Sequence, residues 1–401
     1  MQGAWTAEAR IKNSRDVSET YFDPAVAALA EGCSPLEIGQ VHGAYAAFAD
    51  AQYLENLKAT DVKRTRYELY AQRKEAEFVE IDRQLKTYHD LKSLQVSQLK
   101  KSKRDAQQHL EEDKRQLDDA KATTNLMLQR ALDNYAKALT ASDAQDDQIH
   151  RFCALWLEHS GDDELHKKLV PLLAQIPSFK FVFLAYQLSA RLSKLSQPTP
   201  FATNITKLVV RLGSDHPFHT LFPVYALREA SADGKSSRGR RSSAAADLGS
   251  QSGRAKAAEE VFVKVKKVAR LTQRVESLEL ACSAYSEWAN FKVSRDDRFS
   301  TAGQGDRRHM RKGPHQIPKD LKLLTRVVNL PIPVSTFDVP IDHTCEYPAA
   351  NLPCIVKYGS VFLCPGGVHV PKIVTCHASD GKEYRQLVRL LPWLDLSPLT
   401  F

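Results

Sequence analysis

The sequence predicts a mainly α-helical protein that ends in a small antiparallel β-sheet. Apolar residues recur at spacings of three and four along most of the chain before residue 293, and no proline interrupts residues 36–170. After Pro314 the pattern changes to short β-branched segments separated by turn residues. These observations place helices first and strands last.

A long helical hairpin is predicted over residues 42–140. Residues 1–40 precede it as short helices, because Asp23 and Pro24 form a helix-start signal. The two apolar stripes of the hairpin contain Phe78, Ile81, Leu85, Tyr88, Leu128, Leu132, Tyr135 and Leu139. Polar residues 86–116 carry its tip. The pattern is typical of a coiled-coil hairpin with a charged, solvated outer face.

Shorter and more apolar helices are predicted over residues 149–230. The expected helices are residues 149–159, 179–195, 201–212 and 217–230, and the second is apolar all round, which predicts that it is buried. Stacked helices of this length indicate an α-solenoid, so residues 1–230 are interpreted as one helical region.

Two basic segments rich in small residues interrupt the helices. Residues 231–258 and 294–315 are predicted to be flexible linkers, because their Gly, Ser and charged composition cannot bury a core. Between them, residues 259–293 are predicted to form one more helix.

The last region, residues 316–388, is predicted to form a sheet. The predicted strands are residues 354–363, 368–376 and 383–390. Gly366 and Gly367 separate the first two, and Asp380 and Gly381 form a strong hairpin-turn dipeptide before the third. Three prolines within residues 327–340 favour an extended connection or an edge strand there.

The composition excludes several classes of protein. The net charge is only +8, from 56 basic and 48 acidic residues, which does not indicate a dedicated nucleic-acid binder. No signal peptide is recognisable, and the longest apolar run is too short and too polar to span a bilayer. The seven cysteines contain no C-x-x-C pair, so reduced thiols in a nuclear or cytosolic compartment fit best.

Several segments, in the same order along the chain, resemble the ATM-type kinases of the phosphatidylinositol-3-kinase-related family, a branch that includes the fungal telomere-maintenance kinases. They are residues 48–53 (FADAQY), 151–160 (RFCALWLEHS), 176–181 (IPSFKF), 186–188 (YQL), 215–222 (DHPFHTLF), 366–373 (GGVHVPKI), 379–383 (SDGKE) and 385–388 (RQLV). The resemblance implies a FAT-type α-solenoid followed by the start of a kinase N-lobe. It also implies a nuclear serine/threonine kinase of the DNA double-strand-break response and telomere maintenance, which phosphorylates Ser or Thr followed by Gln.

The resemblance also implies a nucleotide-covering glycine loop. Its residues are Cys364, Pro365, Gly366, Gly367, Val368, His369 and Val370. The two glycines would let backbone N–H groups approach a phosphate, although a Gly-Gly pair between strands also fits a plain hairpin turn. ATP and Mg²⁺ are expected in the full-length family, and this segment is not expected to hold either tightly. The family also implies homodimers, protein substrates and protein partners on the FAT helices, with no membrane association.

The sequence departs from the kinase pattern after Val388. The family carries Lys at the next position, where this chain has Arg389, and residues 390–401 include Pro392 and Pro398 instead of a helix. Residues 306–309 (DRRH) only approximate a catalytic loop, and no Asp-Phe-Gly occurs. We therefore predict no catalytic residue and no kinase activity for the chain by itself.

Alternatives remain at the level of sequence. The chain could be a non-enzymatic helical scaffold whose hairpin binds a protein partner, or, less well supported, a nucleic-acid binder using the basic residues 235–241 and 307–312. His216 and His219 could ligate a metal beside Asp215, but Asp215 also fits a helix N-cap.

Overall fold

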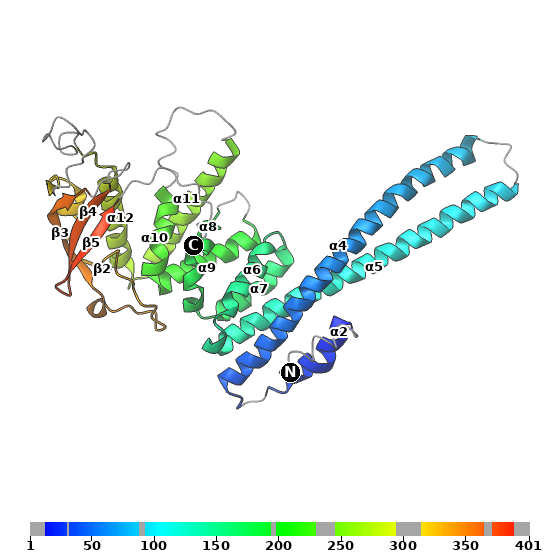
Figure 1. The fold of residues 1–401 in the computed structure, drawn as a ribbon, viewed down its shortest axis with the longest axis horizontal. Helices are drawn as coiled ribbons and strands as arrows, with labels where there is room; N and C mark the ends of the chain where they lie inside the picture. The colour runs from blue at the N-terminus through cyan, green and yellow to red at the C-terminus, as the bar shows by residue number, and fades with distance from the viewer. Residues whose placement is uncertain are drawn as a thin grey trace, which may run out of the picture. The chain divides into compact units, whose positions relative to one another are not determined.

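A computed structural model describes residues 13–29, 32–87, 93–193, 198–229, 245–293, 314–364 and 371–388. The chain divides into two compact units, Met1–Pro177 and Ser178–Phe401 (Figure 1). The first unit is helical, and the second contains both helices and the sheet. The predicted class, a mainly α-helical chain with a small antiparallel sheet at its end, is confirmed.

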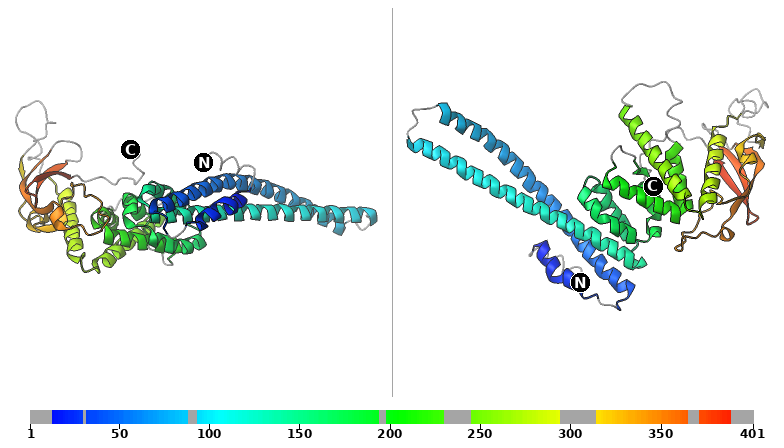
Figure 2. Two further views of the ribbon diagram at one scale, coloured as in Figure 1. Left: turned by 90° about the horizontal axis from the view of Figure 1, so that it is seen from below. Right: turned by 180° about the vertical axis from the view of Figure 1, so that it is seen from behind.

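The first unit is built on the predicted hairpin. Helix α4 (Pro35–Thr87) and helix α5 (Ser93–Ala141) run side by side in all views (Figures 1 and 2). With 53 residues, α4 is about 80 Å long. Ser34 and Glu37 form a capping box at its start: the Ser34 amide donates to Glu37 Oε2 at 2.8 Å, and the Glu37 amide donates to Ser34 Oγ at 3.2 Å. The Ser34 amide and the Ser34 hydroxyl, which donates to the same carboxylate oxygen at 2.8 Å, lower the pKa of Glu37.

The base of the hairpin contains a core and several paired polar groups. Helices α6 (Gln148–Glu158) and α7 (Asp163–Gln175) pack against α5 there. Arg151 of α6 binds the Asp50 carboxylate of α4 with two 2.6 Å hydrogen bonds, and Tyr135 of α5 donates to the same carboxylate at 3.1 Å. This cluster fixes three helices to one another. The short elements before the hairpin are α2 (Ser14–Val17), η1 (Ser18–Phe22) and α3 (Asp23–Ala27).

The second unit begins with elements that correct one prediction. Residues 179–195 were expected to form one buried helix. The structure has a 3-10 helix η3 (Ser178–Leu184) followed by the short helix α8 (Ala185–Ala190), and Phe183 and Tyr186 are 75% and 57% exposed. Each of these two short elements contacts the core on one side only. The apolar side chains on their other sides, such as Phe183 and Tyr186, therefore stay exposed.

Helices α9 (Pro200–Asp215) and α10 (Pro217–Glu229) confirm the next two predicted helices. Helix α11 (Ala245–Lys266) contradicts the predicted linker at residues 231–258, because the second half of that segment is helical. Ala255, Ala257 and Ala258 are buried on α11. Alanine has the highest helix propensity and needs little space, so an Ala-rich segment can pack where its composition suggested flexibility.

The helix predicted at residues 259–293 is also divided. Helix α11 ends at Lys266, and helix α12 (Thr272–Asn290) follows. Leu271 is fully buried between them, and the Thr272 hydroxyl donates to the Lys266 carbonyl at 2.9 Å. The turn thus satisfies one of the carbonyls at the end of α11. Most of the second predicted linker, residues 294–313, lies outside the described residues.

The sheet of the second unit is antiparallel throughout. Strands β1 (His315–Gln316) and β2 (Leu330–Pro333) both pair with β3 (Cys354–Leu363), and β4 (Lys372–Ala378) and β5 (Glu383–Val388) follow in the order β3-β4-β5. The predicted Asp-Gly turn is confirmed: Gly381 has φ +77°, and Asp380 accepts hydrogen bonds from the Lys382 amide and the Tyr384 hydroxyl. Other short elements are α14 (Lys322–Thr325) and η5 (Ala349–Asn351).

No single described helix is long and apolar enough to cross a membrane, although residues 163–175 and 178–190 meet the length and composition requirement together across a bend.

Candidate functional site

The predicted glycine loop lies between β3 and β4. The last β3 residue, Leu363, pairs with Ile373 of β4, so the two stems of the loop are held in one hairpin. Cys364 follows β3 and is buried. The other predicted loop residues, Pro365, Gly366, Gly367, Val368, His369 and Val370, lie outside the described residues.

One face of the sheet carries an apolar row beside these stems. Leu363 pairs with Ile373, and Ile373 pairs with Leu387 of β5, so the three side chains project from the same face at the loop end of the sheet. Leu387 is 59% exposed, and the other two are partly exposed. The row is therefore a small, partly exposed apolar surface.

The opposite face of the sheet is covered by helix α12. Phe362, Val374 and Gln386 form the adjacent row, and each is at most 2% exposed. Trp288 of α12 meets the ring of Phe362 edge-on, with 4.9 Å between ring centroids. The sheet thus has one supported face and one open face at the loop.

Two tyrosines connect α12 to the centre of the sheet. Tyr285 of α12 lies 2.6 Å from the Tyr358 hydroxyl of β3, and Tyr358 donates to Gln386 Oε1 at 2.8 Å. Burial raises the pKa of both phenols, so both stay protonated and act as hydrogen-bonding groups. Their arrangement positions the sheet and offers no general base.

Lys372 occupies the first position of β4, next to the loop. It is 3% exposed, and its ammonium group donates to the carbonyls of Trp288 at 3.0 Å and Ala289 at 2.9 Å, in the last turn of α12. The ammonium also lies 5.3 Å from the centroid of the Trp288 ring. Burial lowers the pKa of Lys372.

A second cluster joins the β2–β3 connection to helices α9 and α10. We call residues 342–347 of this connection the clasp. His216, between α9 and α10, is fully buried: its Nδ1 lies 2.7 Å from Tyr347 OH, and its Nε2 lies 3.2 Å from Ser178 Oγ. Burial lowers the pKa of His216 to about 4, so the neutral imidazole fills this position.

The clasp backbone is strained and held by several contacts. Cys345 and Tyr347 have φ values of +61° and +50°, in the left-handed region that non-glycine residues rarely adopt. Arg270 donates to the Cys345 carbonyl at 3.0 Å, and Arg274 of α12 donates to the Glu346 carbonyl at 3.0 Å. These contacts offset the strain and fix the clasp against the helices.

The contacts of His216 and His219 bear on whether these residues ligate a metal or have a structural role. His219 Nε2 contacts the Val339 carbonyl at 2.8 Å, and no group of three potential ligands able to hold a metal occurs among the described residues. The expected N-cap role of Asp215 is wrong, because Asp215 is the last residue of α9 and pairs with Arg211 at 3.7 Å. Helix α9 continues beyond the predicted end at residue 212, to Asp215.

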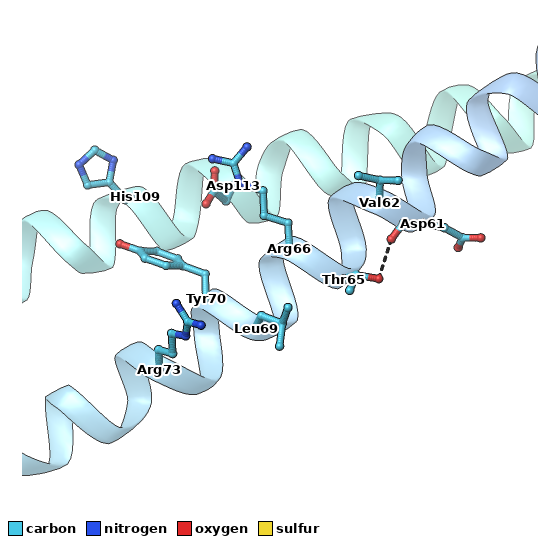
Figure 3. Close-up of a pocket in the computed structure, with 9 residues that line it drawn as sticks. All are labelled: Asp61, Val62, Thr65, Arg66, Leu69, Tyr70, Arg73, His109 and Asp113. Carbon is cyan, nitrogen blue, oxygen red and sulfur yellow. Dashed lines mark hydrogen bonds between the residues drawn. The ribbon is translucent and has the colours of Figure 1, made fainter.

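A groove also lies elsewhere, in the first unit. It has a volume of about 950 Å³ and lies between α4 and α5 (Figure 3). Its lining residues are Asp61, Val62, Thr65, Arg66, Leu69, Tyr70, Arg73, His109 and Asp113. It contains none of the predicted site residues.

Comparisons with known proteins place this geometry in a family. The chain is 31% identical over 405 aligned residues to the serine-protein kinase ATM of Sus scrofa, and 30% identical over 388 to the serine/threonine-protein kinase tel1 of Emericella nidulans. The alignments cover 96% and 97% of this chain. The chain belongs to the ATM and Tel1 kinases. No family profile matches the sequence.

The chain spans 12% of the length of the ATM relative and 13% of the tel1 relative. Its fold is similar to a solved structure described as the FAT and kinase domain of CtTel1, with a TM-score of 0.72 and 23% identity. That match covers 95% of this chain and 23% of the solved chain. A further structure, a complete CtTel1 dimer, matches with the same TM-score and identity. The FAT-type helices and the start of an N-lobe sheet are therefore the fold of this chain.

Within this ATM and Tel1 fold, sequence reasoning located the glycine loop between two strands but did not single out Lys372 or the apolar row. Both features follow from the strand alternation of residues 372–378, in which every second side chain is buried. That alternation puts Lys372 on the buried face and Ile373 on the open one.

Proposed function

We propose that this chain is the part of an ATM- or Tel1-type serine/threonine kinase that joins the FAT helices to the nucleotide-covering hairpin of the kinase N-lobe. One observation carries the proposal: the apolar row of Leu363, Ile373 and Leu387 opens beside the stems of a Gly-Gly loop. A glycine loop and an apolar surface are what a purine nucleotide requires of an N-lobe.

The residues present fit this ligand. The partly exposed row suits the flat face of a base, and Gly366 and Gly367 would let backbone N–H groups approach phosphate oxygens. When bound in the full-length protein with Mg²⁺, ATP would supply the transferable phosphoryl group. The residues of this chain would bind and cover the nucleotide, and they would exclude water on the N-lobe side.

We further propose the role that the ATM and Tel1 names suggest for the whole protein: phosphorylation of Ser or Thr before Gln, in the nucleus, in the response to DNA breaks and in telomere maintenance. The full-length protein would act on protein substrates as a homodimer. The chain alone would be inactive, because it offers no recognisable catalytic Asp or metal-binding Asp.

Hydrogen exchange with and without millimolar ATP tests the nucleotide surface. We expect ATP to slow exchange in peptides that cover residues 360–376, and Ile373→Glu to abolish that effect, while Val328→Glu, at a 43% exposed position outside the strands, keeps it. Protection confined to the helices, or equal protection in both variants, would contradict the proposal. A peptide kinase assay on a Ser-Gln substrate should show no phosphate transfer by the 401-residue chain.

The groove between α4 and α5 favours a second function, the binding of a protein partner by the helical scaffold. Val62 and Leu69 of α4 are 70% and 54% exposed, seven residues apart, and both line the groove shown in Figure 3. Seven-residue spacing puts them on one face of α4, where a partner helix could pack. Cross-linking the wild type and a Val62→Lys, Leu69→Lys variant in a lysate that contains the partner would test this function.

A further inference from the structure

We propose that the groove between α4 and α5 binds an acidic amphipathic helix of a partner protein. The inference rests on the second proposed function, the binding of a protein partner by the helical scaffold, and it names the chemistry of that partner. Two features of α4 carry it: a pair of exposed apolar side chains, and a pair of arginines that have no acidic partner among the described residues.

The groove presents apolar and basic side chains alternately along one stripe of α4. Val62, Arg66, Leu69 and Arg73 all line it and follow one another at spacings of four, three and four residues (Figure 3). This spacing keeps the four side chains on one face of the helix. Each pair recurs after seven residues, which is about 10.5 Å along the helix axis. A partner helix that lies along α4 repeats its own side chains over the same distance.

The apolar pair is open to a partner. Val62 and Leu69 are 70% and 54% exposed, and Tyr70, which also lines the groove, is partly buried beside them. Apolar side chains of a partner helix would remove this surface from water, which is the main driving force for the packing of one helix on another. The partner should therefore carry apolar residues seven positions apart.

The arginine pair gives the groove its charge preference. Arg66 and Arg73 form no ion pair with any carboxylate of the part of the chain that the structure describes. Asp61, which also lines the groove, is already paired with Arg64 at 3.1 Å. A guanidinium keeps its charge at physiological pH and binds a carboxylate with two parallel hydrogen bonds. The partner should therefore also carry acidic residues seven positions apart.

The opposite wall of the groove restricts where those acids can lie. It contains His109 and Asp113 of α5, and Asp113 is partly buried. The Asp113 carboxylate would repel a second carboxylate placed on the α5 side. The acidic side chains of the partner should therefore face α4, and its side toward α5 should be uncharged or basic. This arrangement describes an amphipathic helix with one acidic edge.

Fluorescence anisotropy with designed peptides tests the proposal on the 401-residue chain. The probe is a labelled helical peptide of about three heptads, in which leucine and glutamate each recur every seventh residue. Two matched peptides carry glutamine or lysine in place of glutamate. The variant Arg66→Glu, Arg73→Glu reverses the two charges of the stripe. Its control, Arg115→Glu, Lys121→Glu, changes the net charge equally at exposed positions of α5 that do not line the groove.

We expect the wild type to bind the glutamate peptide about tenfold more tightly than the lysine peptide, with the glutamine peptide between them. Added salt should reduce the difference. Arg66→Glu, Arg73→Glu should reverse the preference, and the α5 control should keep it. Circular dichroism establishes that each variant folds. If the Glu variant does not fold, Arg66→Gln, Arg73→Gln takes its place and should lose the preference without reversing it.

Three results would overturn the proposal: no binding of the glutamate peptide, equal binding of all three peptides by the wild type, or an unchanged preference in the arginine variants. A second copy of this chain in the groove would also overturn it. That occupant would appear in sedimentation as concentration-dependent self-association that Val62→Lys, Leu69→Lys abolishes.

Cross-linking with the same variants keeps this inference separate from the second proposed function. A partner that is lost in Val62→Lys, Leu69→Lys but retained in Arg66→Glu, Arg73→Glu would support protein binding and overturn the acidic chemistry. If the glutamate peptide binds with the expected charge preference and no partner is cross-linked, the second function fails while the selectivity of the groove stands.

Discussion

Acidification from pH 7 to pH 5 is expected to weaken the second unit through one residue, His216. Burial is the largest influence on this imidazole and lowers its pKa to about 4. Asp215 and Asp342 act in the opposite direction, whereas His219 and Arg211 lower the pKa further. The neutral ring is therefore the form that fits between Ser178 and the clasp.

The sign and size of the effect follow from the difference between the folded and unfolded pKa values. An unfolded histidine titrates near 6.5, so the unfolded chain binds more protons than the folded one between about pH 6.5 and pH 4. The contribution of His216 is fully present above pH 6.5 and is lost as the pH falls toward 4. With a folded pKa of about 4, the free energy of unfolding should fall by about 2 kcal/mol at pH 5.

Urea unfolding at pH 7 and pH 5 would measure this loss. His216→Gln removes the titrating group, so its loss between the two pH values should be about 2 kcal/mol smaller than that of the wild type. Tyr347→Phe keeps the imidazole and removes one partner at 2.7 Å, so it should keep most of the pH dependence. The comparison of slopes is needed because burial also lowers the pKa of His159 in the first unit.

Histidine-selective NMR gives the direct reading of the same quantity. The His216 ring signal should not titrate until the pH falls well below 6. A His216 signal that titrates near 6.5, or an equal pH-dependent loss in His216→Gln, would refute the reasoning that burial keeps this ring neutral.

Three further predictions concern stability. Arg151→Met should lower the free energy of unfolding of the first unit by about 2 kcal/mol, because it leaves the Asp50 carboxylate without its bidentate partner, and a double-mutant cycle with Asp50→Asn should show strong coupling. Gly381→Ala should cost about 1 kcal/mol from the positive φ alone, since no atom lies within 4 Å of an added Cβ, and Gly381→Asn should cost less by thermal unfolding. Ser34→Ala should cost about 1 kcal/mol by removing the capping box of α4, and Glu37→Gln, which can still accept from the Ser34 amide, should cost less in the same denaturant experiment.

The sequence predicted the elements whose signals are local. The heptad-like stripes and the absence of proline defined the hairpin of α4 and α5, and Asp380 with Gly381 defined the β4–β5 turn. Where composition was the only guide, the prediction failed. Composition predicts a linker for the Ala-rich segment before residue 259, yet this segment is part of α11 because its small side chains pack against neighbouring helices.

The candidate site was predictable only in part, because most of its contacts join residues distant in sequence. Lys372 meets carbonyls more than 80 positions earlier, and His216 meets Tyr347 at a separation of 131. No periodicity or motif encodes such pairs. What the sequence offered was the alternation of β4, which assigns each residue to a face without saying what covers that face.

The two clusters of the second unit use backbone carbonyls in the same way. At the clasp, Arg270 and Arg274 donate to carbonyls of a strained segment, and at the loop stem Lys372 donates to carbonyls of a helix end. A hydrogen bond to a backbone carbonyl depends on where the backbone lies. It is therefore lost when a helix or strand shifts, even if no side chain is substituted. Helix α12 carries one contact of each cluster, Arg274 as a donor and Trp288 as an acceptor. A change that displaces the clasp should therefore reach the start of β4 through α12. Arg274→Met should therefore speed hydrogen exchange in a peptide that covers β4 as well as in one that covers the clasp, and faster exchange in the clasp alone would contradict this connection.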